Sequence, residues 1–137
     1  MPRLSGVLET ALYVEDLERA RSFYERLFEL PLLRSDRRMC AFDVSGGGVL
    51  LLFLQGASTN PVEMPGGVIP AHDGHGPVHI AFSIAAKDVA AWEKRLIDFE
   101  IEVEGRSTWP RGGLSLYFRD PDRHLLELAT PGLWLGY

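Results

Sequence analysis

A carboxylate stands in the middle of an apolar stretch near the start of the chain. Glu9 lies in the sequence Gly-Val-Leu-Glu-Thr-Ala-Leu-Tyr-Val, residues 6–14, which otherwise has the composition of a strand. An unpaired charge costs several kcal/mol when it is buried, unless it is neutralised by a proton. We therefore expect Glu9 to lie on a solvated face, to pair with a cation, or to bind a metal ion.

Further polar side chains occupy alternate positions in stretches that are typical of strands. Successive side chains of a strand point to opposite faces. Each of these stretches has one face of large apolar residues, suited to contact with a helix, and one face of small and polar residues. If helices cover the first kind of face, the second kind lines a cavity. The side chains predicted to share this concave surface are Glu9, His79, Ser115, Tyr117 and Glu127.

The elements that would position these side chains occur twice. In the first half, a strand is followed by Asp16, a good N-cap, and by a helical apolar pattern over residues 17–28 that ends before Pro31. A hairpin follows, with arms at 40–44 and 49–54 around a Ser-Gly-Gly-Gly turn.

The second half repeats this order. Its pattern predicts a strand at 78–84, a helix at 87–99, a strand at 101–107 and a hairpin over 114–130 that turns at Asp120-Pro121-Asp122. We therefore predict one domain, 1–137, built from modules 6–56 and 77–130. The connection 57–76 is rich in Pro and Gly, and a connection of that length is typical of a linker or a functional lid.

Composition limits the function classes. The 137 residues carry a net charge of −5, which argues against a nucleic-acid partner. No apolar run approaches the roughly 18 residues of a membrane span. The single cysteine, Cys40, lies in an apolar run and reads as a small buried residue, and a lone cysteine suits the cytoplasm.

Three segments carry a family resemblance: residues 12–28, 75–82 and 115–128, the last reading Ser-Leu-Tyr-Phe-Arg-Asp-Pro-Asp-Arg-His-Leu-Leu-Glu-Leu. In this order and spacing the chain resembles the vicinal oxygen chelate superfamily of glyoxalase I, extradiol dioxygenases, fosfomycin-resistance enzymes and bleomycin-resistance proteins. The resemblance implies an α+β fold in which two βαβββ modules form a cupped mixed sheet. It also implies a metal and substrate site, often completed across a homodimer.

The resemblance implies a ligand set as well. His79 and Glu127 match two of the family's metal ligands, and Glu9 stands where the first strand usually supplies a His. We expect these three to bind Mn²⁺, Fe²⁺, Ni²⁺ or Zn²⁺, with Glu9 and Glu127 also catalytic. Residues 49–54 hold no fourth ligand, which weakens a glyoxalase I assignment. The extradiol dioxygenases bind iron through two His and one carboxylate, and this site has only one His. A Lewis-acid role on a substrate with two adjacent oxygens therefore fits better than oxygen activation.

The pattern Ser-x-Tyr-Phe-x-Asp-Pro-Asp is most similar, within the superfamily, to the fosfomycin-resistance group. Arg111 stands four residues before Ser115, so an anionic group of a substrate could bind between Arg111 and Ser115. Alternatively, Arg111 is a surface residue. That group's basic residue after the last strand has no match in residues 130–137. Aromatic side chains could contact a substrate or serve in packing: Tyr13, Trp109, Tyr117 and Trp134.

Three functions remain open. The first is a metal-dependent small-molecule enzyme, acting as a lyase, isomerase, hydrolase, dioxygenase or transferase. The second is a metal-free homodimer that sequesters a drug, as bleomycin-resistance proteins do, and the third is a regulatory binder. A homodimer is expected from a long sheet edge and from the apolar residues 133–135. His72 and His75 are either solvated loop residues or part of a lid that brings an acid or base over the metal.

Overall fold

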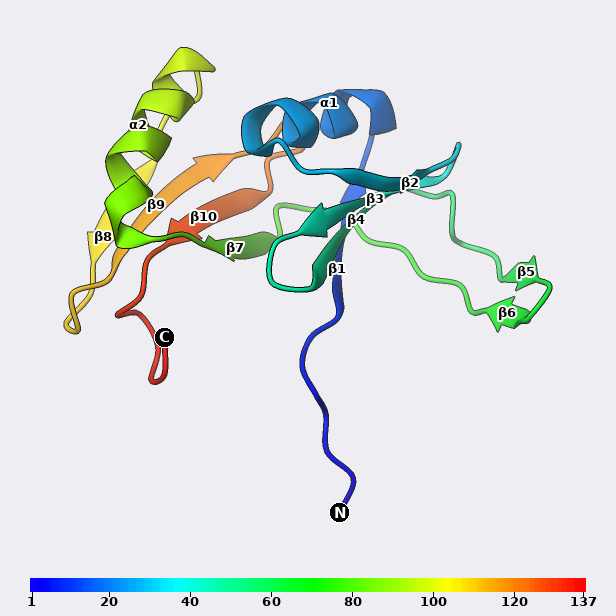
Figure 1. The fold of residues 1–137 in the computed structure, drawn as a ribbon. Coiled ribbons are helices and arrows are strands. Elements are labelled where there is room, and N and C mark those ends of the chain that lie inside the picture. The colour runs from blue at the N-terminus through cyan, green and yellow to red at the C-terminus, as the bar shows by residue number, and fades with distance from the viewer. The chain divides into compact units, whose positions relative to one another are not determined.

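The computed structural model describes all 137 residues, which form two compact units, Met1–His75 and Gly76–Tyr137. Each unit contains a strand, a helix and three further strands in that order, and the first unit has an additional short hairpin near its end (Figure 1). The predicted α+β fold class with two βαβββ modules is confirmed. None of the helices combines the length and hydropathy that a membrane span requires.

The first unit holds a mixed four-stranded sheet in the order β1-β4-β3-β2. Strand β1 pairs in parallel with β4, and the other pairs are antiparallel. The bounds of these elements are β1 Glu9–Val14, α1 Leu17–Phe28, β2 Leu32–Ser35, β3 Met39–Val44 and β4 Gly48–Leu54. The two arms of the predicted hairpin are β3 and β4.

Helix α1 spans the predicted residues because its ends are well specified. At its start, the Asp16 carboxylate accepts the backbone N–H of Arg19 at 3.0 Å, as an N-cap does. At its end, Glu29 adopts the left-handed conformation with φ 54°. The buried face of the helix, with Ala20, Tyr24 and Leu27, packs on strands β3 and β4. The opposite face of the sheet is thereby left for other contacts.

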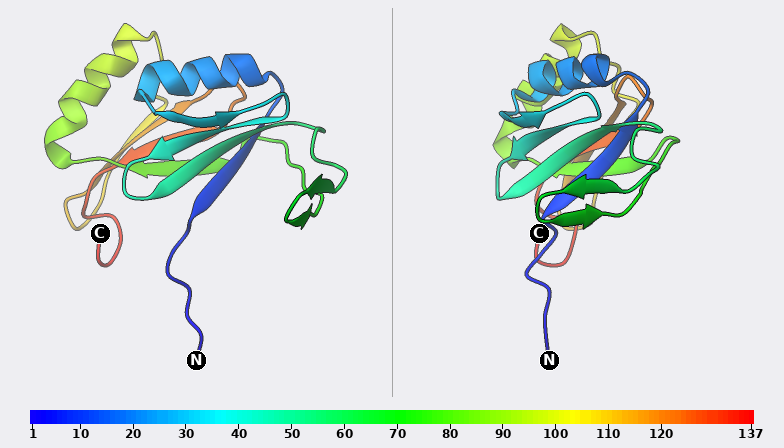
Figure 2. Two further views of the ribbon diagram at one scale, coloured as in Figure 1. Left: turned by 45° about the vertical axis from the view of Figure 1, so that its right-hand side comes forward. Right: turned by 90° about the vertical axis from the view of Figure 1, so that its right-hand side faces the viewer.

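The connection between the modules carries a small hairpin that the sequence analysis did not predict. Strands β5 (Val62–Met64) and β6 (Gly67–Ile69) pair around Pro65-Gly66 at the end of a long excursion from β4 (Figure 2). The base of the excursion is closed by hydrogen bonds: the Gly56 N–H donates to Asp73 at 3.1 Å, and the His72 N–H donates to the carbonyl of Ser58 at 2.9 Å. The excursion is therefore part of the first unit.

The second unit holds a mixed sheet in the order β7-β10-β9-β8. Its elements are β7 His79–Ser83, a 3₁₀ turn at Ala86–Asp88, α2 Val89–Asp98, β8 Gly105–Thr108, β9 Leu114–Arg119 and β10 Leu125–Ala129. Strand β10 is parallel to β7 and antiparallel to β9. An ion pair between Glu93 of α2 and Arg106 of β8 ties the helix to the edge of the sheet.

The predicted strand at 101–107 is wrong in its first four residues. After α2, the Ile101 N–H donates to the carbonyl of Leu96 at 2.8 Å. The residues that follow the helix are therefore hydrogen-bonded to its last turn, where a strand was expected. Strand β8 begins only at Gly105. The turn before β10 is held by Asp120, whose buried carboxylate accepts the N–H groups of Asp122 and His124 and contacts the His124 ring at 2.7 Å.

Candidate functional site

The second unit brings His79 and Glu127 together. Strand β7 lies beside β10 with His79 opposite Leu125, so Glu127 follows two residues further along β10. The His79 Nε2 atom lies 3.1 Å from Oε2 of Glu127. The Glu127 side chain is only 6% exposed, whereas that of His79 is 47% exposed. The pair therefore has a buried carboxylate and an imidazole that is accessible from outside.

The hydrogen bond on the far side of the imidazole determines its tautomer. Nδ1 of His79 lies 2.9 Å from the carbonyl oxygen of Leu125, which can only accept, so Nδ1 carries a proton. In a neutral ring Nε2 is then an acceptor that faces a carboxylate oxygen, itself an acceptor. A cation between the two, either a proton or a metal ion, removes this conflict. Metal-binding histidines commonly donate their other N–H to a backbone carbonyl, so this donor set fits a divalent metal.

The other oxygen of Glu127 is held by a chain of hydrogen bonds. The Ser115 hydroxyl, which is fully buried, donates to Oε1 at 2.5 Å. Ser115 in turn accepts the indole N–H of Trp109 at 2.9 Å. Both residues were predicted to contact a substrate. In the structure their polar atoms orient the carboxylate of Glu127.

Two further predicted substrate residues lie in the same unit. The half-buried ring of Tyr117 is tilted beside the His79 ring, with 6.4 Å between centroids. Arg111 is exposed in the turn between β8 and β9. The Ser115 hydroxyl forms hydrogen bonds with Glu127 and Trp109 and none with Arg111.

Glu9 occupies the corresponding position in the first unit. It lies opposite Val49 across the parallel pair β1–β4, as His79 lies opposite Leu125 across β7–β10. By the same register, Leu51 stands where the second unit has Glu127. Glu9 is exposed and makes no hydrogen bond or ion pair. The first unit therefore supplies one carboxylate, and neither unit by itself gathers three or more His, Cys, Asp or Glu side chains around a common point.

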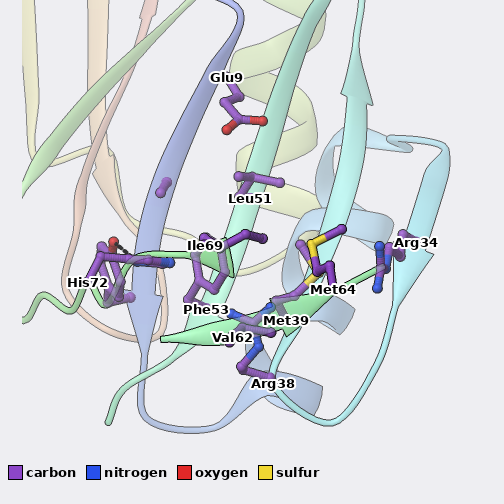
Figure 3. A pocket seen from close by; sticks show the side chains of 12 residues that line it. Glu9, Arg34, Arg38, Met39, Leu51, Phe53, Val62, Met64, Ile69 and His72 are labelled. Atoms are coloured by element: carbon purple, nitrogen blue, oxygen red, sulfur yellow. Dashed lines mark hydrogen bonds between the residues drawn. The ribbon is translucent and has the colours of Figure 1, made fainter. Parts of the chain in front are cut away.

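A cavity of about 500 Å³ opens on the face of the first sheet that α1 leaves uncovered (Figure 3). Strands β1 to β4 form its floor, and the hairpin β5–β6 forms part of its wall. Glu9 lies at one end of the cavity, and Arg38 lies at the other. Its lining residues are Glu9, Ala11, Tyr13, Arg34, Arg38, Met39, Leu51, Phe53, Val62, Met64, Ile69 and His72.

One side of this cavity is closed by a contact between Tyr13 and His72. The Tyr13 hydroxyl lies 2.7 Å from Nδ1 of His72, and the His72 ring stands edge-on to Phe53. Burial, together with the nearby carboxylate of Asp73, raises the pKa of Tyr13, so its phenol stays neutral at physiological pH. Tyr13 thus lies on the cavity wall. His75 is exposed and does not line the cavity.

Several residues of this cavity were not predicted from the sequence. The cations Arg34 and Arg38 and the hairpin residue Met64 are the clearest examples. The Pro65-Gly66 pair, flanked by Val62 and by Val68-Ile69, is a two-residue turn signal that could have located the hairpin. The two arginines have no comparable signal, because they lie in an exposed strand and turn without periodicity.

Comparison with known proteins agrees with this architecture. The family model for the Glyoxalase/Bleomycin resistance protein/Dioxygenase superfamily matches residues 6–128. The metallothiol transferase FosB of Bacillus licheniformis is 33% identical over 129 residues, which cover 93% of this chain and 77% of that protein.

Two solved structures are also similar. The lactoylglutathione lyase of Agrobacterium tumefaciens has a TM-score of 0.87 and 32% identity, covering 97% of this chain and 98% of that one. The fosfomycin resistance protein FosX of Listeria monocytogenes shares the fold, with a TM-score of 0.69, 23% identity and coverage of 93% and 94%. The chain belongs to the Glyoxalase/Bleomycin resistance protein/Dioxygenase superfamily.

Proposed function

We propose that this protein is an enzyme that uses a divalent metal ion as a Lewis acid on a small substrate with two neighbouring oxygens. Membership in the superfamily and similarity to a metallothiol transferase support a metal-dependent enzyme. The observation that carries the proposal is the His79–Glu127 pair, in which Nε2 lies 3.1 Å from a carboxylate oxygen while Nδ1 contacts the Leu125 carbonyl, the arrangement common for a metal-binding His.

His79 and Glu127 are the proposed ligands in the second unit, and Glu9 is the proposed third ligand. Two carboxylates and one imidazole neutralise a divalent cation and suit Mn²⁺, Fe²⁺, Ni²⁺ or Zn²⁺. When bound, the metal would supply charge stabilisation for an oxygen that becomes negative during the reaction. Ser115 would hold Glu127 in the ligating orientation, and Tyr117 would contact the substrate beside His79. Arg111, exposed in the turn between β8 and β9, remains a proposed anion-binding group.

A thiol compound is the proposed co-substrate. The names of two similar proteins, a metallothiol transferase and a lactoylglutathione lyase, both describe chemistry of thiol compounds. The chain itself offers no nucleophilic thiol, because Cys40 is fully buried and burial raises its pKa to about 11. The attacking sulfur would therefore come from a second small molecule, and the proposed reaction class is transfer of that sulfur to a carbon of the substrate. The thiolate would form a carbon–sulfur bond as the bond from that carbon to a substrate oxygen breaks, and the oxygen would keep the bonding electrons and take up the proton of the thiol.

A cytoplasmic homodimer is proposed as the working form. Exposed apolar side chains gather at the two ends of the chain, where water would otherwise contact them: Leu4, Val7, Leu8, Trp134 and Leu135. Strands β1 and β7 are also edge strands of their sheets. Edge strands and apolar patches of this kind favour association with a second copy.

Metal uptake tests the proposed ligands. Protein prepared without a histidine tag is dialysed against Mn²⁺, Ni²⁺ or Zn²⁺, and bound metal is measured by mass spectrometry. We expect one metal per chain in the wild type, loss in His79→Ala, weaker uptake in Glu9→Gln, and retained uptake in Glu9→His. The matched control is His75→Ala, which removes an exposed imidazole and should change nothing. Stoichiometric metal in both Glu9→Ala and His79→Ala would show that the site is elsewhere.

The sequestering function is the alternative. Bleomycin-resistance proteins bind a large cationic drug in an acidic groove, as the family resemblance implies. Here two arginines and one glutamate line the cavity of the first unit, which does not favour a cationic ligand. A wild-type protein that takes up none of the three metals would nevertheless make sequestration the better description.

A further inference from the structure

We propose that the cavity of the first unit binds an amphipathic organic anion, that is, a molecule with an apolar body and one carboxylate, phosphonate or similar oxyanion at its end. This inference deepens the proposed function, because Glu9 lies in the wall of the same cavity. It assigns the substrate a size and a charge distribution that the proposed metal chemistry leaves open.

The size of the cavity sets the size of the ligand. Pockets of about 300–1,000 Å³ hold drug-sized molecules. A volume of about 500 Å³ lies within this range and would leave a three-carbon phosphonate loosely surrounded. The expected ligand is therefore considerably larger than fosfomycin.

The walls of the cavity favour an apolar body. Its floor is formed by Met39, Leu51 and Phe53, each less than a tenth exposed, in one cluster on the sheet. The hairpin contributes Met64 and Ile69, which remain 47% and 40% exposed although they line the cavity. A ligand that covers these two side chains would remove apolar surface from water. Methionines on the floor and on the hairpin, Met39 and Met64, can adapt to different ligand shapes.

The charged groups of the cavity are separated by this apolar surface. Arg38 lies at the end away from Glu9 (Figure 3). Its guanidinium donates to the Ser58 hydroxyl at 2.8 Å and lies 5.5 Å from the centroid of the Phe53 ring, so its direction is fixed. Arg38 forms no ion pair, and its remaining guanidinium N–H groups donate no hydrogen bond to the protein. A fixed guanidinium with unused donors is suited to an oxyanion.

Arg34 adds a second cation to the same cavity. Its only acidic neighbour is Asp36, with an N–O distance of 3.7 Å, and the Arg34 side chain is 69% exposed. This separation is longer than a hydrogen bond, so the guanidinium can turn toward a ligand without losing a strong contact. An extended ligand would place its anionic end near Arg34 and Arg38, its apolar body on the floor, and its reacting oxygens toward Glu9.

The test uses metal-free protein in EDTA and isothermal titration calorimetry. The probes are octylphosphonate, propylphosphonate and octyltrimethylammonium, which vary the apolar body and the charge one at a time. We expect octylphosphonate to bind one molecule per chain, propylphosphonate to bind at least tenfold more weakly, and the cation not to bind. If octyltrimethylammonium or propylphosphonate binds as tightly as octylphosphonate, the inference is overturned.

Variants locate the binding site. Arg38→Gln should weaken octylphosphonate binding by about 10–100-fold, since a hydrogen bond to a charged group is lost. Arg34→Gln should weaken it less, and it tests the same cavity if Arg38→Gln does not fold. Arg37→Gln is the matched control, because Arg37 is exposed next to Arg38 and does not line the cavity. If all three variants bind as the wild type does, the probe is bound elsewhere and the inference is wrong.

The two proposals can fail separately. A protein that takes up metal through His79 but does not bind octylphosphonate would overturn this inference and leave the metal-dependent enzyme standing. A protein that binds octylphosphonate through Arg38 but takes up no metal would support this inference and overturn the metal-dependent function.

Discussion

Replacing Ser115 with alanine removes a buried hydroxyl that orders two other polar groups. The wild-type hydroxyl donates to Glu127 and accepts from Trp109. A buried polar group that loses its partner costs about 1–3 kcal/mol, and a charged one costs more. Trp109 is 36% exposed, so water can replace its lost partner, whereas Glu127 is only 5% exposed and keeps just His79. We therefore expect the free energy of unfolding to fall by about 2–3 kcal/mol, mostly through Glu127.

Urea denaturation followed by circular dichroism measures this loss. Ser107→Ala is the matched control, because Ser107 lies opposite Ser115 on the neighbouring strand, is half-buried and makes no hydrogen bond through its hydroxyl. It should change stability by less than about 0.5 kcal/mol. The metal affinity of Ser115→Ala should also fall by about 10–100-fold, since a group that orients a ligand is lost. If Ser115→Ala and the wild type have the same midpoint in urea, Ser115 does not hold Glu127 and this account of the site is wrong.

Two further changes test the first unit. Burial raises the pKa of Cys40 from 9.0 to about 11, so between these pH values the unfolded thiol loses its proton while the folded one keeps it. The free energy of unfolding should therefore fall by about 2 kcal/mol more in the wild type than in Cys40→Ala as pH rises from 9 to 11. Urea midpoints that change equally with pH in the two proteins would contradict this. Gly74→Ala would place a Cβ 2.5 Å from the Tyr13 ring, so it should displace the Tyr13–His72 contact and lower the melting temperature. Gly66→Ala, which meets open space, is the control, and equal melting of the two variants would show that the contact with Tyr13 is unimportant.

The helices were predictable because local chemistry specifies them. Asp16 caps α1 through a hydrogen bond to a residue three positions away, and the buried residues Ala20, Tyr24 and Leu27 follow helical spacing. Both signals lie within one short segment, so no distant contact is needed to recognise them. The strands with alternating or continuous apolar residues, such as β3 and β4, were found for the same reason.

The missed strands lack a local pattern of alternating apolar residues, and only β5 and β6 have a turn signal, at Pro65-Gly66. All four residues of β2 are exposed, and its pairing with β3 shifts register between Leu32 and Arg34. Strands β5 and β6 have only three residues each and are mostly exposed. These segments become strands through a partner elsewhere in the chain, and a periodicity argument does not detect that.

The candidate site was predictable in part. The strand alternation placed His79, Ser115 and Glu127 on one face, and the structure joins them by hydrogen bonds. What alternation could not show was the direction of each polar atom: Ser115 faces Glu127, although it had been assigned to a substrate anion. The roles of Arg34 and Arg38 depend on a cavity closed by residues more than twenty positions away, which no local pattern reveals.

The hydrogen bonds that lead from Trp109 through Ser115 to Glu127 have an optical consequence. Hydrogen bonds in series polarise one another, so a cation on Glu127 makes its oxygen a weaker acceptor, and the Ser115 oxygen then binds the indole N–H less strongly. The emission of an indole responds to what its nitrogen donates to. Binding of a cation to Glu127 is thereby coupled to the fluorescence of Trp109. The emission of Trp109 can therefore report on cation binding, measured above the constant emission of Trp92 and Trp134.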